Sequence, residues 1–207
     1  PAPAGPDAWA TRVSRVIDRA TNQEYICTTS GTSGSAVWSL NLPFSFASQG
    51  YLTANSNVTN VVLATDSVGA STIYYTAFRG NLFFVYNGVS FAPVVITAGQ
   101  MALALSASFQ GANNIYDVFG FLDSTGTARV GFGPAWTTAT AGSGARGTGA
   151  GTTELARTNG ILVNAVQITA NNGATTYTVA ANRGTYLGSV FIDSSAGQVS
   201  CYTSWGQ

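Results

Sequence analysis

The sequence predicts an all-β protein in which a small N-terminal β-hairpin module precedes an antiparallel β-sandwich of jelly-roll type. Short segments rich in Val, Ile, Tyr, Phe and Thr recur at a spacing of roughly 8–12 residues, as they do in sandwiches and barrels. Turn sequences such as QGANN, DSTGT and DSSAG separate these segments. Hydrophobic residues make up 45% of the 207 residues, so a substantial core can form.

The N-terminal module is expected to span residues 1–42. Its first eight residues are rich in Pro, Ala and Gly and predict an arm, and the following RVSRVIDR suits either a short helix or a strand. The strand EYICTT, the turn SGTSG and the returning strand SAVWSL then predict a β-hairpin. In that hairpin we expect Cys27 and Trp38 to pack together, and the module to attach to or cap the larger domain.

The sandwich is expected over residues 43–207. Each of its predicted strands is a short run of β-branched and aromatic residues bounded by turn residues. In order, the predicted strands are VTNVVLAT (58–65), STIYYTAF (71–78), NLFFVYN (81–87), VSFAPVVIT (89–97), ALALSASF (102–109), NIYDVFGFLD (114–123), ARVGFG (128–133), GILVNAVQIT (160–169), TYTVAA (176–181), TYLGSVFID (185–193) and QVSCYTSW (198–205).

Three segments of this domain carry more specific expectations. VFGFLDSTGTARVGFG, residues 118–133, predicts a hairpin because turn residues separate two alternating runs. Residues 137–153 contain almost no apolar side chain larger than Ala and predict a long flexible surface loop. TELARTNGILV, residues 153–163, is interpreted as holding one short helix that ends at Asn159–Gly160.

The charge content excludes several classes of partner. Only 8% of the residues are charged, and eight arginines balance eight carboxylates. Binding to nucleic acid needs a basic stripe, whereas these arginines are scattered, so no nucleic-acid partner is expected. The longest apolar-rich run is interrupted by Thr97, Gly99 and Gln100, so no membrane insertion is expected. A surface with so little charge suits a protein inside an assembly.

The two cysteines do not predict a metal or redox centre. Cys27 and Cys201 stand near opposite ends of the sequence, with no histidine and no third cysteine, so the usual zinc ligand set is missing. There is no C-x-x-C motif either. The two thiols can pair with each other, pair between chains or stay free, and we favour two buried free thiols. No cofactor and no metal are expected.

Catalytic residues are also not expected. A serine nucleophile normally needs a histidine or lysine as its base, and the chain has neither. A glycosidase or depolymerase needs two carboxylates about 5–10 Å apart. Asp117 stands inside a predicted strand, where a carboxylate is unusual, but no second carboxylate lies at a telling spacing. Asp117 more simply caps a turn or pairs with an arginine such as Arg79 or Arg183.

Aromatic residues make up 12% of the chain and supply the candidate ligand-binding residues. An aromatic ring can stack on the C–H face of a sugar, with Asn, Gln or Thr bonding the hydroxyls. Trp136, Tyr75, Tyr86 and Trp205 are the candidates for such glycan stacking. Core packing competes with this role, and because adjacent strand residues face opposite sides, at most one of Tyr74 and Tyr75 belongs to the core.

Several motifs occur in a definite order along the chain. The first is the TNQEYICTTSGTSGSAVW segment that contains the predicted hairpin. The others are Gly50-x-Leu52-Thr53; then Asp66, Ile73, Tyr74, Tyr75, Gly80 and Asn81; then Tyr86-Asn87-Gly88; then NIYDVFGFLD (114–123), GPAW (133–136) and RGTYLGSVFID (183–193).

Together these motifs resemble small hairpin modules and β-rich fibre-type domains of virion surface proteins of tailed bacteriophages. The resemblance covers about residues 18–43 and 50–207. It implies a non-enzymatic fibre, spike or decoration subunit at the virion surface, assembled as a homotrimer or another symmetric oligomer with other virion proteins as partners. The alternatives are a receptor-recognition module that binds host cell-surface polysaccharide and, further off, a polysaccharide depolymerase.

Overall fold

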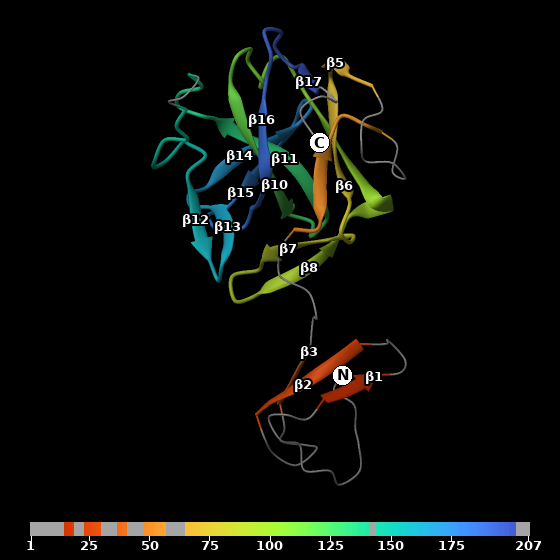
Figure 1. The fold of residues 1–207 in the computed structure, drawn as a ribbon. Coiled ribbons are helices and arrows are strands. Elements are labelled where there is room, and N and C mark those ends of the chain that lie inside the picture. Colours follow the sequence, from red (N-terminus) through yellow and green to blue (C-terminus); the bar gives the residue numbers. More distant parts are fainter. Residues whose placement is uncertain are drawn as a thin grey trace. The chain divides into compact units, whose positions relative to one another are not determined.

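The computed structural model describes residues 15–18, 23–29, 37–40, 48–56, 65–140 and 144–201, the first three ranges by their backbone alone (Figure 1). In these residues the fold is all-β, as predicted. Every strand pairing among the described residues is antiparallel, and their one helical element is a 3-10 turn, η1 (Thr97–Gly99). No helix of the described residues could span a membrane.

The chain divides into two compact units, Pro1–Ser45 and Phe46–Gln207. The sequence analysis placed its division three residues earlier, after residue 42. The first unit holds a three-stranded sheet in the order β1-β2-β3, made of β1 (Arg15–Asp18), β2 (Gln23–Thr29) and β3 (Val37–Leu40). The register places Cys27 opposite Trp38. The predicted contact between their side chains lies outside what the structure describes.

The second unit is built around a seven-stranded sheet, in the order β12-β13-β16-β10-β11-β14-β15. β10 lies in its centre, and all but its end residues are at least nine-tenths buried, which explains why its sequence is almost uninterruptedly apolar. The strands of this sheet are β10 (Ile115–Leu122), β11 (Ala128–Ala135), β12 (Leu155–Thr158), β13 (Ile161–Asn164), β14 (Ile168–Asn172), β15 (Thr175–Val179) and β16 (Thr185–Phe191).

Three smaller sheets pack with the large one (Figure 1). They have the orders β4-β6-β9, β7-β8 and β17-β5. Their strands are β4 (Gly50–Thr53), β5 (Ser67–Ala70), β6 (Thr72–Ala77), β7 (Leu82–Tyr86), β8 (Phe91–Val95), β9 (Gln100–Ala104) and β17 (Val199–Cys201).

The core forms two clusters that share β10. Val118 belongs to the larger cluster, with Tyr75, Phe83 and Phe132. The next residue, Phe119, belongs to the second cluster, on the side of β14 and β15. Successive side chains of a strand point to opposite faces, so one central strand supplies both clusters.

Side chains, in addition to backbone ladders, join the sheets. Asn172 on β14 reaches β9, where its amide nitrogen donates to the carbonyl of Ala102 (2.8 Å) and its oxygen accepts the amide of Ala104 (2.8 Å). A similar arrangement satisfies β7, whose Phe84 carbonyl accepts a bond from the Thr185 hydroxyl. These contacts give backbone groups of β7 and β9 a hydrogen-bond partner from another sheet.

The predicted hairpin over residues 118–133 is confirmed as β10 and β11. The predicted helix near residues 153–163 is wrong. The segment forms the β12–β13 hairpin, and Asn159 and Gly160 both have positive φ (48° and 89°). Positive φ at two adjacent turn residues is the geometry of a type I′ hairpin turn, for which Asn-Gly is the strongest sequence signal. The signal interpreted as a helix end was therefore a strand connection.

Two further segments differ from the predicted strands, and one predicted strand is not described. GILVNAVQIT, expected as one strand, forms β13 and β14 with a break between them. β5 was not predicted, because its SVGA sequence has a glycine and little bulk. The predicted strand over residues 58–65 lies almost wholly outside the described residues.

Candidate functional site

The most densely bonded polar group of the described residues is the carboxylate of Asp117, which is fully buried on β10. Its Oδ1 accepts bonds from the Ser189 hydroxyl (2.6 Å) and the indole nitrogen of Trp136 (3.0 Å). Its Oδ2 accepts bonds from Nε of Arg146 (2.7 Å) and the hydroxyl of Thr153 (3.2 Å). The Asp117 site is the name used below for these five residues.

Three parts of the fold supply the four residues that surround Asp117. Ser189 lies on β16 and opposes Asp117 in the strand register. Trp136 follows the end of β11, and Arg146 and Thr153 belong to the glycine-rich segment 137–153. Burial of a charge in protein is costly unless it is paired and hydrogen-bonded, and here a charged arginine and three neutral donors do both.

Arg146 also packs against aromatic rings. Its guanidinium carbon lies 4.3 Å from the ring centroid of Trp136 and 5.5 Å from that of Tyr186. The Arg146 side chain is 31% exposed, whereas Asp117 is 0% exposed. The arginine therefore covers the carboxylate from solvent and uses the cation–π attraction of two rings to hold its position.

This arrangement changes the interpretation of residues 137–153. The sequence predicts a flexible loop, but its described part is tied to the sheet. Thr138 and Ala145 form a β-bridge, Arg146 binds Asp117, and the amide of Gly149 donates to a carboxylate oxygen of Glu154 (2.6 Å). Composition shows the lack of apolar side chains but cannot show an anchoring ion pair, so it does not predict these attachments.

The prediction that Asp117 pairs with an arginine is confirmed, but the partner is Arg146 and not Arg79 or Arg183. Arg183 instead donates to the carbonyl of Tyr86 (3.2 Å). Both Asp117 oxygens already accept hydrogen bonds from neighbouring side chains. In the described part of the chain, no three His, Cys, Asp or Glu side chains group as metal ligands.

The structure places the candidate stacking residues in different environments. Tyr75 is fully buried on β6, so the prediction that its ring stacks on a glycan is wrong. Its hydroxyl accepts the amide of Gly50 (3.0 Å), and burial raises the pKa of Tyr75. β6 lies between β4 and β9, and the face of this strand that carries Tyr75 packs into the larger core cluster.

Tyr86 is half-buried at the end of β7. Its ring packs against Phe91 at a centroid distance of 5.2 Å, and its hydroxyl donates to the Gly88 carbonyl (2.9 Å). These contacts hold the β7–β8 turn. Trp205 and the side chain of Cys27 lie outside the described residues.

Trp136 lines a pocket of about 590 Å³, together with Asn113, Thr140, Gly144 and Phe191. Arg146 lies over the Trp136 indole. The more accessible ring is Phe191, which is 53% exposed at the end of β16. Phe191 is not among the stacking residues predicted from the sequence, although strict alternation along TYLGSVF places it on the same face as Ser189.

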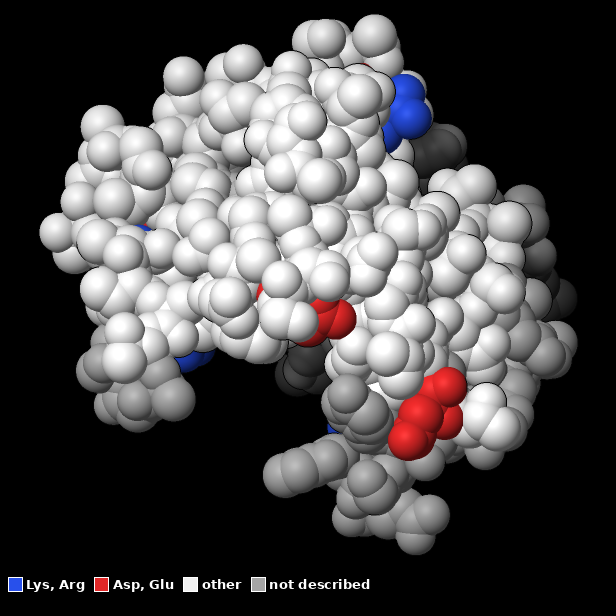
Figure 2. Space-filling view, turned by 90° about the horizontal axis from the view of Figure 1, so that it is seen from above, with Lys and Arg blue, Asp and Glu red and all other residues white. Residues whose placement is uncertain are grey.

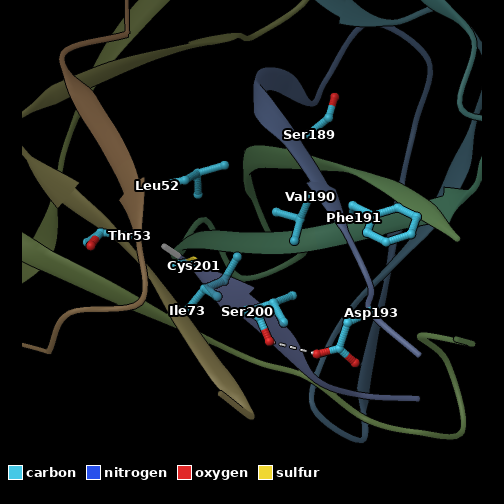
Figure 3. A pocket seen from close by; sticks show the side chains of 10 residues that line it. Leu52, Thr53, Ile73, Ser189, Val190, Phe191, Asp193, Ser200 and Cys201 are labelled. Carbon is cyan, nitrogen blue, oxygen red and sulfur yellow. Dashed lines mark hydrogen bonds between the residues drawn. The ribbon is translucent and has the colours of Figure 1, made fainter. Parts of the chain in front are cut away.

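A second pocket of about 450 Å³ lies between β4, β16 and β17 (Figure 3). Leu52, Ile73 and Val190 give it a largely apolar lining, and the Ser200 hydroxyl donates to Asp193 beside it (2.9 Å). Cys201 also lines this pocket as a free thiol, and burial raises its pKa. A raised pKa keeps the thiol protonated and poorly nucleophilic.

Comparisons with protein-family models, with curated proteins and with solved structures found no match to this chain. Its function must therefore be argued from its own residues.

Proposed function

We propose that this chain is a non-enzymatic structural subunit on the surface of a tailed phage or phage-like particle. It would be a fibre, spike or decoration protein that assembles with copies of itself, as a trimer if the resemblance of its motifs holds. Its partners are then its own copies and other proteins of the particle.

The observation that carries this proposal is a surface poor in charge and rich in exposed apolar side chains. Figure 2 shows charged groups only as isolated spots on the face that it presents. The described residues include eight large hydrophobic side chains that are at least 41% exposed: Tyr51, Val68, Phe78, Val89, Val95, Phe109, Leu122 and Phe191. Burial between subunits would stabilise such a surface at roughly 25 cal/mol per Å² of apolar area.

The Asp117 site supports the non-enzymatic part of the proposal. Its carboxylate is closed off by Arg146 and fixes a loop to the sheet, which is what a rigid structural subunit requires. An enzyme acting on polysaccharide would need a second carboxylate facing the same space. A reducing-end assay on capsule or envelope polysaccharide tests this point. Hydrolysis that Asp117→Asn abolishes in a folded protein would contradict the proposal.

Native mass measurement over a range of concentrations tests assembly. We expect a closed oligomer of like chains whose population rises with concentration. Repeating the measurement with reductant separates disulfide-linked chains from non-covalent ones. A monomer at every concentration would contradict the proposed self-assembly.

A second candidate function, recognition of a host glycan, is favoured by the pocket beside Trp136. Phe191 offers an aromatic face, and Asn113 and Thr140 offer an amide and a hydroxyl, with no charged residue among the described lining. Such a lining suits a neutral sugar. Binding on a glycan array that Phe191→Ala removes would support it, and an array signal no higher than that of a denatured control would contradict it.

A further inference from the structure

The outer edge of β15 ends the seven-stranded sheet of the larger unit without a partner strand in the described residues. β15 pairs with β14 over its whole length, from Thr175–Asn172 to Val179–Ile168. Thr175, Thr176 and Thr178 are exposed. In an antiparallel pair, alternate residues direct their backbone N–H and C=O groups away from the partner, so this edge presents free hydrogen-bonding groups.

Several other edges of the same unit are bonded by other groups or carry a residue that discourages pairing. The outward carbonyls of β7 accept bonds from the Gln49 amide, the Thr185 hydroxyl and the Arg183 guanidinium. The edge of β9 is bonded by the Asn172 side chain. β8 contains Pro93, which lacks an N–H, and β12 carries the exposed Arg157. Prolines, charges and covering side chains are the devices by which proteins prevent edge-to-edge pairing.

β15 has none of these devices. Its sequence, TTYTV, contains no charge, proline or glycine, and threonine, tyrosine and valine all favour strands. Among the described residues, the one side chain bonded to its backbone is Asn164, whose amide nitrogen lies 3.5 Å from the Val179 carbonyl at the end of the strand.

The sequence of β15 is also nearly symmetric about Tyr177. If two copies of β15 pair antiparallel about that residue, Thr176 of each chain lies opposite Thr178 of the other. Thr–Thr pairs are favourable cross-strand neighbours. The Tyr177 ring packs against the Phe121 ring at a centroid distance of 5.5 Å, and the guanidinium carbon of Arg129 lies 5.8 Å from its centroid. These contacts hold the centre of the edge in place.

We propose that β15 pairs with β15 of a second copy of this chain across a two-fold axis, which joins two seven-stranded sheets into one continuous sheet. The proposal rests on the proposed self-assembly and names one contact within it. A two-fold contact links chains in pairs, so the assembly contains an even number of chains. If the chain also forms the trimer that its motifs imply, this contact joins two trimers.

Introduced charges test the contact. The variant Thr176→Lys/Thr178→Lys places like charges opposite each other twice and should weaken the pairing at least about tenfold in native mass or sedimentation measurements. Thr176→Glu/Thr178→Glu should do the same. An equal mixture of the two variants should restore the paired species, because each lysine then opposes a glutamate. Ser124→Lys/Thr148→Lys adds the same charge at exposed sites elsewhere and should leave the assembly unchanged.

Cross-linking tests the register. In a Cys27→Ser/Cys201→Ser background, chains with Thr176→Cys and chains with Thr178→Cys should form a disulfide in a mixture far more readily than either alone, since directly opposed strand residues lie within disulfide reach. An oligomer that the lysines leave intact, or a mixture that cross-links no faster than the single variants, overturns the β15 contact alone. A wild-type chain that stays monomeric overturns both this contact and the proposed self-assembly.

Discussion

At the scale of single residues, Asp117 is a charge without exposed surface in a chain that has few charges. Each of its oxygens is bonded by Arg146 or a neutral donor at 2.6–3.2 Å. All buried polar side-chain atoms of the described residues likewise have partners. A buried ion pair of this kind adds little net stability compared with an apolar replacement, but removing one partner alone is costly.

Asp117→Asn should therefore destabilise the protein. The asparagine keeps the size of the side chain but leaves Arg146 without its counter-charge, and we expect a loss of about 2–3 kcal/mol, lower than for a fully buried pair because Arg146 is 31% exposed. Urea unfolding measures this loss. Trypsin should also cleave faster after Arg146, because the loop is released. Thr148→Asn, at an exposed position of the same segment, is the control, and equal unfolding midpoints for the two variants would contradict this role of Asp117.

Asp123 gives a pH-dependent prediction. Its side chain accepts bonds from Thr125, Thr127 and Arg129 in the β10–β11 turn, and these donors lower the pKa of Asp123, the Thr125 hydroxyl contributing most. A lowered pKa in the folded state means that the stabilisation is present above the unfolded pKa of about 3.9 and is lost as the pH falls through the folded value.

Asp123→Ala should thus lower the unfolding midpoint at pH 7, and its difference from wild type should shrink in strongly acidic solution. Thermal unfolding of both proteins over a pH series measures this difference. A difference that stays constant from neutral to strongly acidic pH would show that the ionised carboxylate contributes nothing to the turn.

Residue patterns alone could identify Asp117 as unusual, because a carboxylate interrupts an apolar strand. They could not identify Arg146, which stands alone in a glycine-rich segment 29 residues away. Tyr74 and Tyr75 show the same limit. Alternation predicts that they face opposite sides, but only the packing of one face of β6 against the larger core cluster decides that Tyr75 is the buried one.

At the scale of elements, the β12–β13 hairpin shows how one signal can have two meanings. Asn-Gly ends helices and also forms type I′ turns, and the apolar residues on both sides of Asn159 fit either pattern. The second meaning holds here because Val163 pairs with Thr185 of β16, a contact that no local pattern contains.

Gly160→Ala should destabilise this hairpin. Gly160 has a φ of 89°, and a Cβ added to it would meet nothing within 4 Å, so the cost comes from the backbone alone. We expect a loss of about 1–2 kcal/mol, measurable by urea unfolding. Asn159→Gly is the matched control and should be close to neutral, because glycine tolerates positive φ. A neutral Gly160→Ala would contradict the type I′ geometry.

At the scale of the whole molecule, the all-β class and most strands followed from alternation and turn residues. The order of the strands did not, because it depends on pairs that are distant in sequence. β5 pairs with β17, and the amide of Gly69 donates to the hydroxyl of Ser200, 131 residues later (3.3 Å). The pockets share this origin, since each is lined by segments from several strands.

The proposed assembly should respond weakly to salt. Contacts between apolar and neutral polar groups are not screened by ions, whereas contacts between charges are. We expect the dissociation constant of the oligomer to change less than about threefold between roughly 0.05 and 0.5 M sodium chloride, as measured by sedimentation. A steep weakening with added salt would mean that the scattered arginines and carboxylates hold the subunits together.

The side chains that satisfy β7 have a consequence for how the protein is made. The Phe84 and Tyr86 carbonyls are bonded by Thr185 and Arg183, about a hundred residues later in the chain. During synthesis, these two carbonyls therefore lack their side-chain partners until the segment that contains Arg183 and Thr185 has left the ribosome. Such long-range closure predicts slow, late folding, and a nascent chain halted before residue 183 should remain sensitive to proteases.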